Sequence, residues 1–371
     1  MGLLALLLPF VACATQAPPR YAAPMYQAPV APPLAEVPRT RVGLLLPLTG
    51  ANRPLGQAML NAAQLALFDQ ADPGIEFLPR DTGGTPGGAA EAARSAIGQG
   101  ARALAGPLTL TETAAAAAPA RAARAPMMAF TSDAAQAGNG VWVLGTTPGE
   151  QAERVANAAA GAGARRFGLL APDDEFGRRL AAALRGRLAT LGLPAPVVLL
   201  HPRIADTAAA ARELAAQAGP EGLDAVMLGL GGDRAKAAAA ALVTALPNRP
   251  RLLGHSLWAQ DPVVAQEAAL AGAWFPGPDP ATRAAFEQRY QAAFGERPPR
   301  LAGVAYDGAA LASRAAREGH GPVGEAMLGA DGPIRLGPDG LAQHGLALFA
   351  VDPSGEPRMV QPAPIPGAAG T

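Results

Sequence analysis

From residue 41 onward, short apolar runs alternate with alanine-rich stretches of helical length, and this alternation constrains the fold more than any other feature. The predicted strands are 41–46, 75–80, 101–105, 126–130, 166–171, 195–200 and 224–230. The predicted helices are 56–70, 89–98, 112–124, 150–162, 177–191, 206–218 and 233–246. Strands separated by such helices pair in parallel and are covered on both faces. Two series, separated near Pro148, predict an α/β fold with two doubly wound lobes.

Composition narrows the functional classes. The 371 residues contain 30 Lys plus Arg and 30 Asp plus Glu, so the formal net charge is +0, and only 16% of the residues are charged. A nucleic-acid binder relies on clustered cations against phosphate, so a nucleic-acid partner is not expected. A chain of this length can bury a large core.

The first 13 residues have the pattern of an export signal. An apolar run from Gly2 to Phe10 is too short to span a bilayer and is followed by small residues and Cys13. Three interpretations stay open: a lipobox in which Cys13 becomes lipidated, ordinary cleavage after Ala14, or an apolar start without a targeting role. Both export interpretations place the mature protein outside the cytoplasm, attached to a membrane only through a lipid on Cys13, if at all.

Residues 14–38 are rich in Pro and Ala and are predicted to be a solvated tether. At ~3.1 Å per residue, such a segment could extend up to ~75 Å from an anchor. The last residues, 362–371, are predicted to be a flexible tail.

Ordered motifs in the rest of the chain resemble leucine/isoleucine/valine-binding proteins. They include Pro47-Leu48-Thr49-Gly50, Gly106-Pro107 followed by hydroxyl residues, Ala129-Phe130-Thr131-Ser132, Phe176-Gly177 and Ala305-Tyr306-Asp307. Asp81-Thr82-Gly83-Gly84 and Leu144-Gly145-Thr146-Thr147-Pro148 are similar to a branch known as penicillin-binding protein activators. The resemblance extends from Arg41 to about Gln361.

The resemblance implies a type I periplasmic-binding-protein fold: two Rossmann-like lobes joined by three crossovers. Lobe one would comprise 41–146 plus 273–329, and lobe two 147–272 plus 330–361. The first hinge would lie near Thr146-Thr147-Pro148. Tyr306 and Asp307 would contribute to hinge structure.

The resemblance also implies that Thr109, Thr111, Thr131 and Ser132 receive the carboxylate of a small amino-acid-like ligand, because loop hydroxyls and helix N-terminal amides bind anions. Thr109 and Glu112 also form a capping box, which needs no ligand. Glu112 places a negative charge in the turn that would receive the carboxylate.

Two further features leave alternatives open. Phe176 stands where many relatives have Tyr, and Trp258 could cover the cleft or pack in the core. Asp173-Asp174-Glu175 could attract an amine or could complement a helix dipole.

No catalytic, metal-binding or cofactor-binding motif is present in the sequence, because the four histidines are scattered and no G-x-S-x-G occurs. We therefore expect a non-enzymatic periplasmic protein without a cofactor or metal. One hypothesis is a lipoprotein that activates a penicillin-binding protein and thereby regulates peptidoglycan synthesis. The alternative is the substrate-binding subunit of an ABC importer for amino acids or amides, whose partner would be an ABC permease.

Overall fold

The computed structural model describes residues 39–354 and 356–367. Cys13, the predicted signal and the predicted tether therefore lie outside the described residues. No helix in the described part of the chain is both long and apolar enough to cross a membrane.

Five parallel strands form the first sheet, in the order β2-β1-β3-β4-β5. The strands are β1 (Thr40–Leu46), β2 (Ile75–Asp81), β3 (Ala101–Ala105), β4 (Met127–Ala129) and β5 (Val141–Val143). The accompanying helices are α1 (Arg53–Gln70), α2 (Pro86–Gly98), α3 (Leu110–Ala122), η1 (Ala134–Gln136), α9 (Pro280–Phe294) and α10 (Ala302–Glu318).

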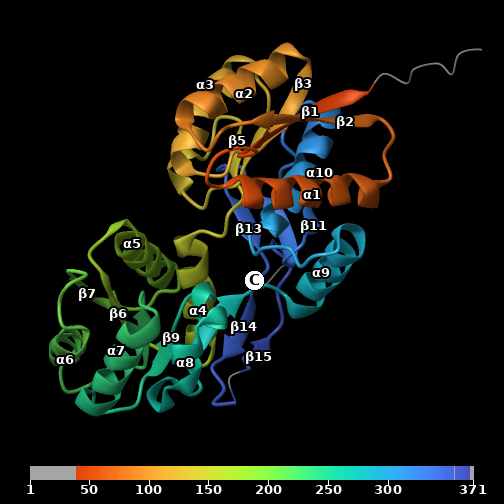
Figure 1. Cartoon of the computed structure of the whole chain (residues 1–371). Coiled ribbons are helices and arrows are strands. Elements are labelled where there is room, and N and C mark those ends of the chain that lie inside the picture. Colours follow the sequence, from red (N-terminus) through yellow and green to blue (C-terminus); the bar gives the residue numbers. More distant parts are fainter. Residues whose placement is uncertain (1–38, 355, 368–371) are drawn as a thin grey trace, which may run out of the picture. The chain divides into compact units, whose positions relative to one another are not determined.

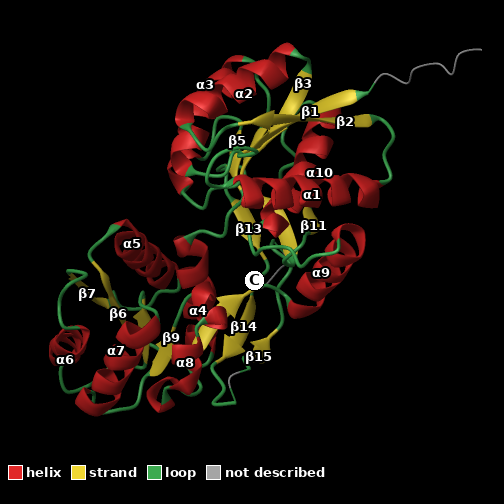
Figure 2. Ribbon diagram, viewed as in Figure 1, coloured by secondary structure: helices red, strands yellow, loops and turns green. Residues whose placement is uncertain are grey.

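Helices cover both faces of this sheet (Figures 1 and 2). Leu44 and Leu46 of β1 are buried with residues of α1 and α10, whereas Leu45 is buried with residues of α2 and α3. Successive side chains of a strand point to opposite faces, so a continuous apolar run is stable only when both faces are covered.

The second sheet has the strand order β15-β14-β10-β9-β8-β6-β7. Its strands are β6 (Phe167–Pro172), β7 (Val197–His201), β8 (Ala225–Leu228), β9 (Arg251–Leu253), β10 (Trp274–Gly277), β14 (Ala347–Ala350) and β15 (Arg358–Gln361). Five are mutually parallel, and β14 and β15 add an antiparallel edge. The helices of this sheet are α4 (Pro148–Gly161), α5 (Glu175–Thr190), α6 (Thr207–Ala218), α7 (Gly232–Ala245), η2 (Ser256–Gln260), α8 (Pro262–Gln266) and η3 (Ala268–Leu270).

Two cores lie on opposite faces of the second sheet. Leu170 of β6 is buried with α6 and α7, whereas Leu169 is buried with α4 and α5. The predicted fold class, an α/β protein with two doubly wound, Rossmann-like lobes, is confirmed.

A third, antiparallel sheet of β11 (Ala326–Leu328), β12 (Pro333–Leu336) and β13 (Ala342–His344) packs on the first lobe. Ile334 and Leu336 share a core with α1 and α10. Because β10 pairs with β9 and β14, the second crossover follows Gly277, and the third follows His344. Both lie later than the expected boundaries at 272/273 and 329/330. The first crossover lies between β5 and α4, at residues 144–147.

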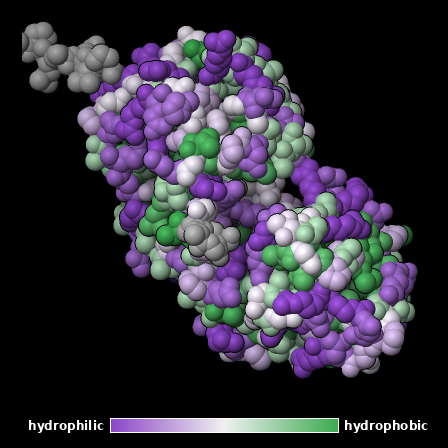
Figure 3. Space-filling view, turned by 180° about the vertical axis from the view of Figure 1, so that it is seen from behind, coloured by the Kyte–Doolittle hydropathy of each residue, from purple (hydrophilic) through white to green (hydrophobic). Residues whose placement is uncertain are grey.

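The surface visible in Figure 3 mixes hydrophilic residues with separate apolar patches, and no single apolar area extends across that face. This distribution fits a chain with few but balanced charges.

Candidate ligand cleft

A cleft of about 390 Å³ lies where loops from both lobes meet. In each sheet the chain reverses its winding direction between two neighbouring strands, β1 and β3 in one and β6 and β8 in the other. Ligands of open α/β sheets bind beyond the carboxyl ends of strands at such points. Residues from both lobes line it, among them Phe130, Thr131, Ser132, Leu144, Phe176, His255, Leu257, Arg300, Leu301, Asp307, Asp331 and His344.

Apolar side chains form much of the wall. Phe130 and Leu144 of lobe one are buried, and Leu257 of lobe two and Leu301 of lobe one are 55% and 39% exposed. Large apolar side chains left exposed in a concave site commonly contact a ligand's hydrocarbon part.

Three predicted site residues line this cleft together. Thr131 is buried, and its Oγ1 accepts a hydrogen bond from the Asp133 backbone N–H at 3.1 Å. Ser132 beside it is exposed, and Phe176 from the start of α5 packs edge-on against His255. Their contact with a ligand stays a prediction.

Thr109 and Thr111 are not among the residues that line the cleft. Glu112 Oε2 accepts hydrogen bonds from the Thr109 N–H at 3.1 Å and its hydroxyl at 2.7 Å, and Oε1 accepts one from the Thr82 hydroxyl at 2.6 Å. The capping box is confirmed. Glu112, only 1% exposed, thus occupies the Thr109 donors, which were among those expected to receive a ligand's carboxylate.

Trp258 packs in the core of lobe two and does not line the cleft. Its indole Nε1 donates a hydrogen bond to the Leu230 carbonyl at 2.7 Å, and its ring packs against Phe275. Of the two alternatives for Trp258, the structure shows packing.

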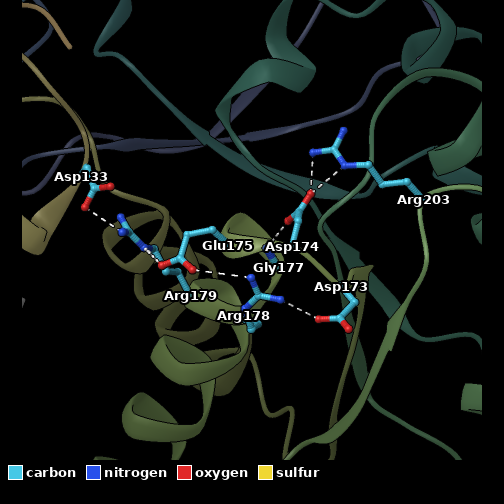
Figure 4. Close-up of polar contacts among 8 residues, drawn as sticks. All are labelled: Asp133, Asp173, Asp174, Glu175, Gly177, Arg178, Arg179 and Arg203. Carbon is cyan, nitrogen blue, oxygen red and sulfur yellow. Dashed lines mark hydrogen bonds and ion pairs between the residues drawn. The ribbon is translucent and has the colours of Figure 1, made fainter. Parts of the chain in front are cut away.

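The acidic run before α5 is fully engaged by arginines of the chain (Figure 4). Asp174 accepts a hydrogen bond from the Gly177 N–H as the helix cap and pairs with Arg203. Asp173 pairs with Arg178, and Glu175 with Arg179. Arg179 also reaches Asp133 of lobe one at 2.7 Å. These carboxylates therefore complement the helix dipole and pair with nearby arginines. Their contacts favour this interpretation over attraction of an amine.

No sequence motif marks the charged groups that surround the crossovers. His344 Nδ1 lies 3.0 Å from Glu150 Oε2, and its backbone N–H donates to Glu150 Oε1. Arg283 donates to Asp331 at 3.0 Å. These residues are distant in the sequence, so no local pattern signals their proximity.

Burial and neighbouring charges shift two pKa values here. Burial alone would lower the pKa of His344, but the Glu150 carboxylate, together with Asp307 and Asp331, outweighs burial and raises that pKa to about 9. Burial raises the pKa of Asp307 to about 7. Asp307 Oδ1 accepts a hydrogen bond from the Ala330 N–H at 2.7 Å, so the residue supports the loop before β12.

Within residues 39–354 and 356–367, no group of three or more His, Cys, Asp or Glu side chains is arranged to hold a metal ion. The cleft instead presents apolar walls and isolated hydrogen-bonding groups, which suits reversible binding of a small molecule.

A family model described as periplasmic binding protein matches residues 39–352. The chain belongs to this family. A search of the curated proteins found no match. The family is consistent with the expected location in the periplasm, and the resemblance inferred from the motifs is confirmed.

Solved structures of other periplasmic binding proteins have the same fold. A protein from Rhodospirillum rubrum described as a branched-chain amino acid ABC transporter aligns with TM-score 0.74 and 19% identity, over 87% of this chain and 100% of that one. The leucine-binding protein LivK of Thermotoga maritima aligns with TM-score 0.55 and 19% identity, over 86% of this chain and 97% of that one.

The C-terminal domain of LpoA from Haemophilus influenzae, described as a regulator of PBP1A, aligns with TM-score 0.70 and 19% identity, over 86% of this chain and 99% of that domain. Against full-length LpoA the alignment covers 87% of this chain but only 59% of LpoA, at 18% identity and TM-score 0.70. Identities this low show the fold alone.

Proposed function

We propose that this periplasmic binding protein is a non-enzymatic lipoprotein, anchored through Cys13, that activates a penicillin-binding protein and so regulates peptidoglycan synthesis. The observation that carries the proposal is the position of Glu112. Its carboxylate accepts the hydrogen bonds of Thr109 that an amino-acid receptor of this fold would offer to its ligand.

Two further points support a regulatory role. The fold aligns with the LpoA domain described as a regulator of PBP1A. The Pro- and Ala-rich segment 14–38 is long enough to carry the folded domain away from a membrane toward a partner.

The test uses the purified full chain in detergent with bifunctional penicillin-binding proteins from the same organism. We expect one of them to co-purify with the chain and to cross-link lipid-linked precursor faster when the chain is added. The double variant Thr111→Ala, Ser132→Ala should stimulate equally, because neither side chain would serve the protein contact. The absence of both association and stimulation would refute the proposal.

The alternative, a substrate-binding subunit of an amino-acid or amide importer, is favoured by one observation. Thr131, Ser132 and Phe176 meet around a cleft large enough for such a ligand. A thermal-shift screen against amino acids and amides tests it, since a ligand at about 100 times its Kd stabilises a protein by ~2.7 kcal/mol. A hit abolished by Ser132→Ala, together with a permease that binds the chain, would favour the importer.

A further inference from the structure

Residues 362–367, which follow β15, start in lobe two. β15 is an edge strand of the second sheet, and its last residue, Gln361, pairs with Leu348 of β14. Gln361 Oε1 also accepts a hydrogen bond at 3.0 Å from Arg154 of α4. The sheet and this arginine therefore fix the start of the segment to lobe two.

The rest of the segment lies against the third crossover and lobe one. Gly345 on this crossover is buried, and a Cβ atom on it would lie 2.1 Å from the Pro364 carbonyl oxygen. A Cβ atom on Gly367 would lie 2.0 Å from Nη1 of Arg335 in β12. The Arg335 side chain itself donates a hydrogen bond to Gln343 of β13 at 3.1 Å. The segment thus connects a strand of lobe two with the three-stranded sheet of lobe one.

The sequence of this segment limits how it can bend. Every second residue from Pro362 to Pro366 is proline, in the run Pro-Ala-Pro-Ile-Pro. Proline fixes φ at about −65° and has no N–H, so such a run stays extended without the hydrogen bonds of a sheet. Chains that join two lobes absorb a rotation of the lobes through changes in φ and ψ. A segment with three prolines has fewer such changes available than an ordinary crossover.

We propose that residues 362–367 form a strap that restricts rotation of the two lobes about the crossovers. The strap is fixed to lobe two through Gln361 and contacts lobe one at Arg335. A rotation of the lobes has to bend or detach it, and the fixed φ angles oppose bending. The strap therefore holds the lobes within a narrower range of angles than the crossovers alone would. This inference does not depend on the contact with a penicillin-binding protein.

Truncation tests the strap directly. A chain that ends at Gln361 keeps β15 and lacks the strap, whereas a chain that ends at Gly367 keeps the strap and is the matched control. Nitroxide labels on p-acetylphenylalanine, placed at the exposed positions of Gln64 in α1 and Gln217 in α6, report the distance between the lobes without reaction at Cys13. Double electron–electron resonance on the protein in detergent measures this distance. We expect the distribution to be at least about 1.5-fold wider without the strap and unchanged in the control.

Hydrogen exchange measured by mass spectrometry gives a second readout at the crossover itself. The Gly345 N–H donates a hydrogen bond to the Pro333 carbonyl at 2.7 Å. Peptides that contain Gly345 should exchange at least about tenfold faster in the chain that ends at Gln361, because the segment that packs on this glycine is gone. The chain that ends at Gly367 should exchange at the rate of the full chain.

A full-length variant keeps the test informative if the truncated chain does not fold. The triple substitution Pro362→Gly, Pro364→Gly, Pro366→Gly keeps the length of the segment and removes its restriction on φ. We expect it to widen the distance distribution, by less than the truncation does. Pro194→Gly, at an exposed proline between α5 and β7, is its control and should leave the distribution unchanged.

An unchanged distance distribution in the truncated chain would overturn the proposal, as would an unchanged distribution in the triple variant. Equal widening in the chain that ends at Gly367 would also overturn it, because the effect would then belong to residues after the strap. Stimulation of a penicillin-binding protein can be present or absent in each case, so failure of this inference is distinguishable from failure of the proposed function.

Discussion

Glu112 is buried although it carries a carboxylate, and its hydrogen bonds offset the free-energy cost of burying that group. Both oxygens accept hydrogen bonds, from Thr82 on one side and from the Thr109 hydroxyl and backbone on the other. A buried carboxylate whose oxygens accept hydrogen bonds stabilises a loop, whereas its removal leaves the buried Thr82 hydroxyl and the half-buried Thr109 donors without this partner.

Glu112→Ala should therefore lower the free energy of unfolding by about 2–3 kcal/mol, measured by urea denaturation. Added acetate should restore part of the loss, because it can accept the vacated hydrogen bonds.

Glu91→Ala is the control for this prediction. The Glu91 side chain is 70% exposed and, among the described residues, pairs only with Arg94, so its loss should change stability by less than about 1 kcal/mol. Equal effects of the two variants would contradict the structural role of Glu112.

At the scale of elements, helices α5 and α1 lie very close to the strands that precede them. A Cβ atom on Gly177, in the first turn of α5, would lie 1.9 Å from the Pro172 carbonyl oxygen at the end of β6. Gly56 in α1 has the same relation to the Pro47 carbonyl, at 2.1 Å. Only glycine allows this approach, which brings Phe176 to the cleft.

Gly177→Ala should destabilise the protein by about 1–3 kcal/mol, because helix α5 must move away from β6. Gly186→Ala, in the same helix, should instead stabilise it by up to about 1 kcal/mol, since a Cβ there meets no atom and alanine favours the helix. Thermal unfolding of both variants measures the difference. A Gly177→Ala protein as stable as the parent would contradict the close packing.

At the scale of the whole folded domain, charged side chains hold the crossovers together. His344 on the third crossover faces Glu150 of α4, Asp307 of α10 and Asp331 of the loop before β12. Arg154 donates a hydrogen bond to the Leu346 carbonyl at 2.7 Å, which joins α4 to the same crossover. Protonation of His344 thus affects segments from both lobes at once.

The raised pKa of His344 makes stability depend on pH. Its folded pKa of about 9 exceeds the value of about 6.5 for an unperturbed histidine, so the stabilisation is complete below pH ~6.5 and is lost as pH rises through ~9. Asp307 also makes stability fall as pH rises, but over a lower pH range, because its folded pKa of about 7 exceeds the ordinary value of 3.8.

We expect the urea midpoint to fall between pH 6.5 and 9, with a loss on the order of 1–3 kcal/mol. His344→Gln should be less stable at pH 6 and should show a flatter profile over this range. His320→Gln, at an exposed histidine, should keep the parent profile. A His344→Gln profile as steep as that of the parent would assign the dependence to other groups.

Local patterns predicted the alternating strands and helices between residues 41 and 246 well. The strand expected at 101–105 is β3 itself, and the helix expected at 206–218 is α6, which begins at Thr207. Among the strands that were missed, β10 and β12 are each four residues long and contain proline, and neither has a local periodicity that distinguishes it from a loop. Their places were decided by pairing with β9, β14, β11 and β13.

The sequence by itself determined the alternation of strands and helices, the two doubly wound lobes and the capping box at Thr109, because each depends on residues a few positions apart. The tertiary structure decided which groups meet at the cleft. It buried Trp258, set Glu112 against the Thr109 donors and left His255 Nδ1 without a partner among the described residues. These outcomes depend on packing between segments up to hundreds of residues apart, where burial and hydrogen-bond partners are properties of the folded domain and not of any local pattern.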